Sequence, residues 1–249
     1  MTSPAVPLSG RFALWFSAWT TGRASLDDAR DVIVADDAAH DVLGLPGATG
    51  SQSLILALGT IRGARATGAG IALPVPGDPT GLAGPAPFNA DVLEAGEGVV
   101  LDGAELGLVP HRIGAGVQWV CQSAVSRRQV PDAADADRTL RRAVLDAAAT
   151  LADLDVARWR PAVADELMAL RREDDRSTGA LPPGTPPLVV RLASLSVRCA
   201  RIVELALEDE GGSLTAAEAA RRRDALAPLE RASRRALVAA CSPAAWPPS

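Results

Sequence analysis

The spacing of apolar residues changes character near Pro131. Between Gly96 and Ser123, short apolar runs are separated by turn residues, which predicts a meander of antiparallel strands with a hairpin turn at Asp102-Gly103. After Pro131, Leu and Val recur every three or four residues, as in amphipathic helices. The pattern therefore predicts an α+β fold, in which a small, mainly antiparallel sheet with N-terminal helices packs on a C-terminal helical bundle.

The same change gives the expected domain boundaries. Residues 10–130 form the layer that contains the sheet, residues 131–244 form the bundle, and residues 1–9 and 245–249 are flexible tails. With 249 residues and 48% hydrophobic content, the chain can bury the core of one large domain or of two small ones. The sequence leaves both arrangements open.

Four helical stretches are expected in the bundle. The longest, Leu188–Glu208, carries apolar residues on two sides, which suits the centre of a bundle. Three further helices complete the bundle: one through Leu140–Leu154, one that starts near Pro161 and one over Thr215–Ala240. We expect Pro228 to kink or divide the last of these helices, because proline lacks the backbone N–H group.

The first predicted helix, residues 10–21, carries an aromatic stripe at helical spacing, made of Phe12, Trp15, Phe16 and Trp19. We expect this stripe to dock the helix onto the core, since aromatic side chains bury large apolar areas. The alternative is an apolar ligand pocket or a partner groove that uses Trp15 and Trp19.

A second short helix, residues 25–34, is predicted by a capping box of Ser25 and Asp28. It is followed by a cluster that brings a histidine close to carboxylates: Asp36, Asp37, His40 and Asp41. A metal could use such groups, but a site needs further ligands from elsewhere. We therefore interpret the cluster as a solvated helix end and expect no metal.

A third helix, Ser51–Ala66, leads into the stretch that is the best candidate for a site. There, Ile71–Val75 alternate as in a half-buried strand, and Pro74 restricts this strand to the edge of a sheet. A loop dense in Gly and Pro follows. Long ordered loops are uncommon, and those that occur are often functional.

Two further polar features have structural explanations. Asn89 is expected to be the N-cap of a helix after the loop, with Phe88 and Leu93 as a hydrophobic staple. The arginines occur in pairs and one triplet, mostly with acids nearby, so we expect them on a solvated face: Arg127-Arg128, Arg141-Arg142, Arg171-Arg172, Arg221 to Arg223 and Arg234-Arg235.

The candidate site combines Asp78 and Thr80 of the loop with His111 and Arg112, which lie at a predicted strand break. A His-Arg pair there can bind a carboxylate or a phosphate, because the guanidinium fork matches oxyanions. Asp78 and Thr80 would orient a hydroxyl group or the imidazole. A turn histidine beside a surface arginine is the simpler interpretation, since nothing in the sequence fixes the distance between His111 and Asp78.

Composition excludes several kinds of chemistry. All 25 basic residues are arginine, so the chain lacks the lysine of a GxxxxGK phosphate loop and of a pyridoxal Schiff base. No cofactor motif is present, and we expect no cofactor. The net charge of −5 argues against a nucleic acid partner. The heavy use of Ala, Gly, Pro and Arg is typical of a bacterial, high-GC genome.

Cys121, Cys199 and Cys241 are far apart and lack CxxC spacing, so we interpret them as buried thiols in a reducing cytoplasm. The N-terminus lacks the features of a signal peptide. No stretch approaches the ~18 apolar residues that span a bilayer, so we expect a cytoplasmic protein without membrane contact.

The sequence favours a non-catalytic module that binds a protein partner or forms a homo-oligomer, because it contains no catalytic constellation and its helices have broad apolar faces. The alternative is an enzyme or binder of a small anionic metabolite at the Gly77–Gly84 loop with His111 and Arg112. The sequence does not decide whether the chain is an enzyme.

Overall fold

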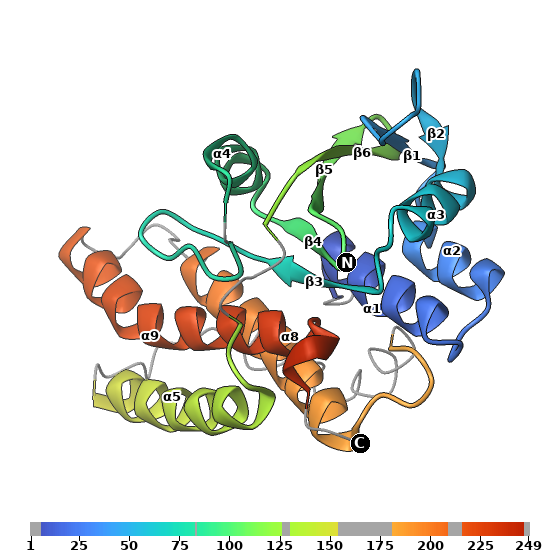
Figure 1. Ribbon diagram of the computed structural model, residues 1–249. Helices are drawn as coiled ribbons and strands as arrows, with labels where there is room; N and C mark the ends of the chain where they lie inside the picture. Colours follow the sequence, from blue (N-terminus) through green and yellow to red (C-terminus); the bar gives the residue numbers. More distant parts are fainter. Residues whose placement is uncertain (1–5, 83, 126–129, 154–180, 209–215, 247–249) are drawn as a thin grey trace.

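The computed structural model describes residues 6–82, 84–125, 130–153, 181–208 and 216–246 (Figure 1). Its centre is a six-stranded sheet with the order β2-β1-β6-β5-β4-β3. The strands are β1 (His40–Leu43), β2 (Gln52–Ser53), β3 (Gly68–Ala72), β4 (Gly98–Asp102), β5 (Leu106–Ile113) and β6 (Gly116–Ser123). Only β1 and β6 pair in parallel, and the other neighbouring strands are antiparallel. The predicted α+β class with a mainly antiparallel sheet is confirmed.

The predicted meander corresponds to β4, β5 and β6. The turn between β4 and β5 begins at Gly103, whose φ of +82° suits glycine, and the predicted turn position is therefore confirmed. Pro110, however, does not end a strand, because β5 continues through it to Ile113. β4 pairs only with Gly107 and Leu108 of β5. At Pro110, β5 therefore has a neighbour on one side only, and a missing N–H group is tolerated there.

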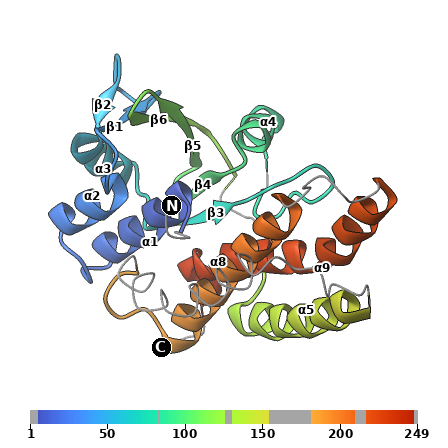
Figure 2. The ribbon, with the colours of Figure 1, turned by 180° about the vertical axis from the view of Figure 1, so that it is seen from behind.

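Three helices near the N-terminus cover one face of the sheet: α1 (Leu8–Thr20), α2 (Leu26–Val34) and α3 (Leu54–Gly63) (Figure 2). All three were predicted. The capping box of α2 is present with both of its hydrogen bonds. The Ser25 side chain accepts from the Asp28 backbone N–H, and the Asp28 side chain accepts from the Ser25 backbone N–H. On the other face, α4 (Ala86–Ala95) packs its Phe88 and Val92 on β4 and β5.

The aromatic stripe docks α1 onto the core, as predicted. Phe12 and Phe16 are fully buried, and the Phe12 ring lies 5.0 Å from the Trp119 ring of β6. Trp15 is buried, and Trp19 is partly buried with the Arg62 guanidinium 4.9 Å from its ring centre. The stripe therefore belongs to the main core.

Asn89 is not the N-cap of α4. The helix begins at Ala86 after Pro85, since proline is well suited to the start of a helix. Asn89 lies inside the first turns, where its Oδ1 accepts a hydrogen bond of 3.0 Å from the Gly84 backbone N–H. The predicted staple is also wrong, because Phe88 is buried against the sheet whereas Leu93 is exposed.

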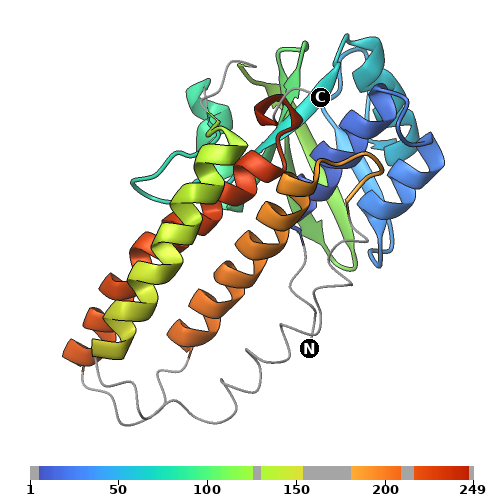
Figure 3. The same ribbon diagram turned by 90° about the horizontal axis from the view of Figure 1, so that it is seen from below.

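The C-terminal helices are α5 (Ala133–Asp153), α8 (Pro187–Glu208) and α9 (Ala216–Ala240), followed by the short 3-10 helix η2 (Pro243–Ala245). They lie side by side and share a core of their own (Figure 3). α9 continues through Pro228, so the proline does not divide it. The helix predicted to start near Pro161 lies outside the described residues, and so does Thr215, the first residue of the helix predicted over Thr215–Ala240.

Within the described residues, no helix is long and apolar enough to cross a membrane.

The edge strand β3 is closed by side chains from remote helices. All five of its residues are buried. Its outward backbone N–H groups donate to hydroxyl groups: Ala69 N–H to Ser17 of α1 at 2.9 Å, and Ile71 N–H to Ser242 after α9 at 3.2 Å. The predicted edge position is confirmed, but the strand lies three residues earlier than expected and is buried on both faces.

Replacing Ser17 by Ala should lower the free energy of unfolding by about 1–3 kcal/mol, because the buried Ala69 N–H group loses its acceptor. Urea unfolding measures the change. Ser123→Ala, an exposed hydroxyl at the end of β6, is the control and should change stability by less than ~0.5 kcal/mol. Equal losses in both variants would contradict the role of Ser17 as an edge acceptor.

Candidate functional site

The loop after β3 is fixed to α9 through Asp78. Its Oδ2 accepts a hydrogen bond from Arg234 at 2.8 Å, and its Oδ1 accepts from Arg235 at 3.3 Å and from the Thr80 hydroxyl at 2.6 Å. Arg231 Nε lies 3.9 Å from Oδ2. We call these residues, Asp78, Thr80, Arg231, Arg234 and Arg235, the Asp78 cluster.

The charge of Asp78 is stabilised by its partners. Burial raises the pKa of this carboxyl, but the hydrogen bonds from Thr80, Arg234 and Arg235 outweigh burial and lower the pKa to about 2. Asp78 is therefore ionised at any physiological pH. A buried carboxylate of this kind costs desolvation free energy, which the three hydrogen bonds offset.

The loop backbone is shaped to present Asp78. The Val75 and Asp78 backbones exchange two hydrogen bonds around Gly77, which has a φ of +83°. Gly81 then passes so close to β3 that a Cβ atom there would lie 2.5 Å from the Ile71 carbonyl oxygen. Glycine is needed at this approach, because real Cβ atoms do not come so near. The Gly/Pro composition thus has a structural cause.

The arginine pairs were predicted to lie on a solvated face, and for Arg234 this is wrong. Only 13% of its side chain is exposed, since it is held between Asp78 and Glu230, the latter at 3.2 Å. Two acids pair with the arginine four residues further along the same helix, Glu230 with Arg234 and Asp137 with Arg141, the second at 2.8 Å. The sequence contained one signal for the cluster, because an acid in an apolar loop needs a cation, but it gave no means of choosing among the arginines.

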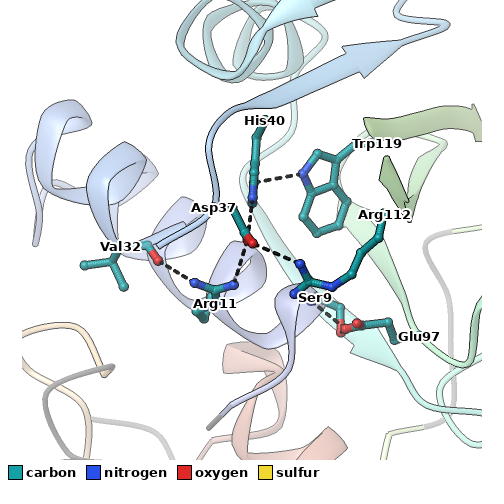
Figure 4. A network of polar contacts seen from close by, with 8 residues as sticks. All are labelled: Ser9, Arg11, Val32, Asp37, His40, Glu97, Arg112 and Trp119. Carbon is teal, nitrogen blue, oxygen red and sulfur yellow. Dashed lines mark hydrogen bonds and ion pairs between the residues drawn. The ribbon is translucent and has the colours of Figure 1, made fainter. Parts of the chain in front are cut away.

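A second polar cluster surrounds Asp37 (Figure 4). Its Oδ1 accepts from Arg112 of β5 at 2.9 Å, while its Oδ2 lies 3.0 Å from His40 Nε2 and 3.5 Å from Arg11 of α1. Arg11 also donates to the Val32 carbonyl oxygen of α2. This Asp37 cluster therefore joins α1, the α2–β1 connection and β5.

His40 is held between two partners. Trp119 Nε1 donates to His40 Nδ1 at 3.3 Å, and because indole only donates, Nδ1 is the acceptor and Nε2 carries the hydrogen that Asp37 accepts. Burial lowers the pKa of His40, the hydrogen bond to Asp37 raises it, and the net direction is down. The imidazole is neutral at pH 7 and has no free nitrogen for catalysis.

The interpretation of residues 36–41 as a solvated helix end is wrong for His40. β1 begins at His40, which pairs with Val117 of β6 and points into the core. Asp41 is exposed on the opposite face, as the alternation of a strand requires. In the part of the chain that the structure describes, no three His, Cys, Asp or Glu side chains group as metal ligands.

The four residues of the predicted anionic site are divided between different places. Asp78 and Thr80 are in contact, in the Asp78 cluster. His111 and Arg112 are neighbours on β5, where they pair with Gln118 and Val117 and so point to opposite faces. Arg112 joins the Asp37 cluster, and His111 is exposed. A common site for all four stays a prediction.

The three cysteines are buried and unpaired. Burial raises the pKa of Cys121 and Cys199 to about 11 and that of Cys241 to about 12. The thiolate is the reactive form, so these thiols are inert at neutral pH. The interpretation of the three cysteines as buried thiols is confirmed.

The fold and its polar clusters define a class: an α+β protein with a mixed sheet and a helical bundle, whose two described polar clusters hold elements together. Two family models match the chain, the N-terminal domain of Rv1486c-like proteins over residues 9–135 and their C-terminal domain over residues 134–238. The chain belongs to the Rv1486c-like protein family.

Its relatives are mycobacterial, in agreement with the bacterial composition. "Uncharacterized protein Rv1486c" of Mycobacterium tuberculosis (strain ATCC 25618 / H37Rv) is 29% identical over 297 residues, which cover 99% of this chain and 100% of the relative. "Uncharacterized protein MAV321" of Mycobacterium avium is 33% identical over 193 residues, or 61% of each chain. No solved structure gives a significant match.

Replacing Asp78 by Asn should lower the free energy of unfolding by roughly 1.5–3 kcal/mol and should speed proteolysis of the loop, because hydrogen bonds to a charged group are lost. Urea unfolding and limited proteolysis measure the two effects. Asp146→Asn, an exposed acid on α5, is the control. A loop that stays protected in Asp78→Asn would show that other contacts hold it.

Acidification from pH 7.5 to 5.5 should destabilise the protein through His40. The unfolded histidine titrates near pH 6.5 and the folded one below this value, so the unfolded state binds more protons as the pH falls through 6.5. The loss approaches at most about 1.4 kcal/mol per pH unit. Urea unfolding at both pH values should show a smaller loss in His40→Gln than in the wild-type protein. An unchanged loss in His40→Gln would rule this origin out.

Proposed function

We propose that this chain is a non-catalytic module that associates with a second copy of itself through the part of the sheet that α4 leaves uncovered. We call this surface the open sheet face. It consists of outward side chains of β1, β5 and β6: Asp41, Leu43, His111, Ile113, Gln118 and Val120.

The open sheet face follows from strand alternation. Along β1 and β6, every second residue is buried against α1–α3, and the residues between them are exposed or half-buried. On β5, α4 covers Gly107 and Val109, but the outward residues beyond them are exposed. None of the described helices covers this part. Ile113, with 59% of its area exposed, and Leu43 are large apolar residues that association would bury.

The polar side chains on this face support a second copy as the partner. Asp41, Gln118 and His111 lie side by side across β1, β6 and β5. A two-fold axis along β6 exchanges β1 and β5, so it brings Asp41 of each copy opposite His111 of the other and Gln118 opposite its own counterpart. An imidazole N–H donates to a carboxylate in either charge state of histidine. This self-complementarity is the observation on which the proposal rests.

The internal hydrogen bonding of the polar residues supports a non-catalytic role. His40 and Asp37 use their hydrogen-bonding groups on one another and on neighbours, and the thiols are inert. Three reduced cysteines also support the proposed cytoplasmic location. The alternative, an enzyme or binder of an anionic metabolite with Asp78, Thr80, His111 and Arg112, has less support, because Asp78 and Arg112 are already paired with other residues.

Light scattering over a range of concentrations tests the proposal. We expect the wild-type protein to be a dimer and Ile113→Asp to raise the dimer dissociation constant at least tenfold, because a buried charge opposes association. Leu145→Asp is the matched control, since Leu145 on α5 is 71% exposed and lies outside the face. A monomeric wild-type protein at high concentration would refute self-association.

Exchanging Asp41 and His111 tests the orientation. Asp41→His alone and His111→Asp alone should each weaken the dimer, because like groups then face each other across the axis. The double variant restores opposite groups at both positions and should regain most of the affinity. A double variant as weak as the sum of the single ones would contradict the proposed axis.

A further inference from the structure

The Asp78 cluster contains more positive than negative charge. Three guanidinium groups, those of Arg231, Arg234 and Arg235, lie within 4 Å of a single carboxylate. Glu230 supplies one further negative charge, which pairs with Arg234 at 3.2 Å. Among the described residues, three positive charges thus meet two negative ones, and the surplus lies on the outer side of the cluster.

Arg231 and Arg235 carry this surplus. Arg231 approaches Asp78 only to 3.9 Å, which is longer than a hydrogen bond, and Arg235 does so at 3.3 Å through one nitrogen. They expose 63% and 50% of their side chains, in contrast to the inner Arg234. Both side chains are therefore largely open to solvent beside the same carboxylate.

Arg231 and Arg235 are four residues apart on α9, so their guanidinium groups can reach the same ligand. Residues four apart on a helix lie on the same face, one turn from each other. Asp78 is fixed by its own loop and by Arg234, so it holds the two outer side chains near it instead of leaving them to spread into solvent. A preorganised pair of guanidinium groups binds an oxyanion with less loss of side-chain entropy than free arginines do.

We infer that Arg231 and Arg235, beside the Asp78 loop, form a binding site for a small anion that carries a phosphate group. A phosphate supplies enough acceptor oxygens for two guanidinium forks at once, and it adds the negative charge that the cluster lacks. Asp78 remains bound to Arg234 on the inner side. The site is separate from the open sheet face, and it does not require the proposed dimer.

Calorimetric titration with pyrophosphate tests the site, with sodium chloride at equal ionic strength as the salt control. We expect wild-type binding, a higher melting temperature that chloride does not reproduce, and at least tenfold weaker binding in Arg231→Gln/Arg235→Gln. Glutamine retains much of the side-chain stem but removes the charge. Arg138→Gln/Arg142→Gln is the matched control, because these arginines have the same spacing on α5 and are exposed, and Arg138 pairs with an exposed acid, Asp135, instead of a buried one.

The single variant Arg231→Gln separates loss of the site from misfolding, because Asp78 keeps its hydrogen bonds to Arg234 and Arg235 in this variant. It should fold as the wild type and bind pyrophosphate several-fold more weakly. The inference is overturned if pyrophosphate stabilises no more than chloride does, or if the α5 control loses as much affinity as the α9 variants.

Discussion

The outward N–H groups of the edge strand β3 have no neighbouring strand, so side chains from remote segments must accept their hydrogen bonds. These contacts tie the remote segments to the sheet. Ser17 comes from α1, which precedes β3, and Ser242 comes from the segment after α9, 171 residues from its partner Ile71. An unsatisfied buried N–H group is costly, so the C-terminal segment completes the sheet. Asp78 adds a second link, across 156 residues, between the loop that leaves β3 and Arg234.

These links explain why the helical bundle does not stand apart from the sheet. Val197 of α8 and Leu237 and Val238 of α9 belong to the hydrophobic core formed by the sheet and α1–α3, while other residues of the same helices form the core of the bundle. The helices α8 and α9 thus serve both cores. The division into residues 10–130 and 131–244 stays a prediction, and the family models meet at residues 134–135.

Local patterns in the sequence predicted most of the elements, and remote partners account for the errors. The period of α1, the capping box of α2 and the turn at Gly103 depend on residues close in sequence, and they were predicted correctly. The buried state of His40 depends on pairing with Val117, and that of Arg234 depends on Asp78. Such long-range contacts leave no periodic signal in one chain.

Within the predicted site, the structure brings Asp78 and Thr80 into contact, whereas Arg112 pairs with Asp37. Asp78 and Thr80 do form a polar unit, since a carboxylate in an apolar loop must be satisfied locally as well as by a cation. His111 and Arg112 were grouped because they are adjacent, yet adjacency in a strand separates side chains onto opposite faces. The sequence predicted a strand break at these residues, so it did not show which face of the sheet each of them points to. That becomes clear only because β5 continues through Pro110.

The alternation of side chains along a strand also gives the two histidines different surroundings. His40 points inward, and both of its ring nitrogens are hydrogen-bonded, one to Trp119 and one to Asp37, so that it joins β1 to β6 and to the α2–β1 connection. His111 points outward in the row that also contains Asp41. A group can serve recognition only if its donors and acceptors are not already used within the fold. Among the described residues, the open sheet face and the outer arginines of α9 keep polar groups exposed to solvent, and these are the surfaces to which we assign the proposed association and the proposed anion site.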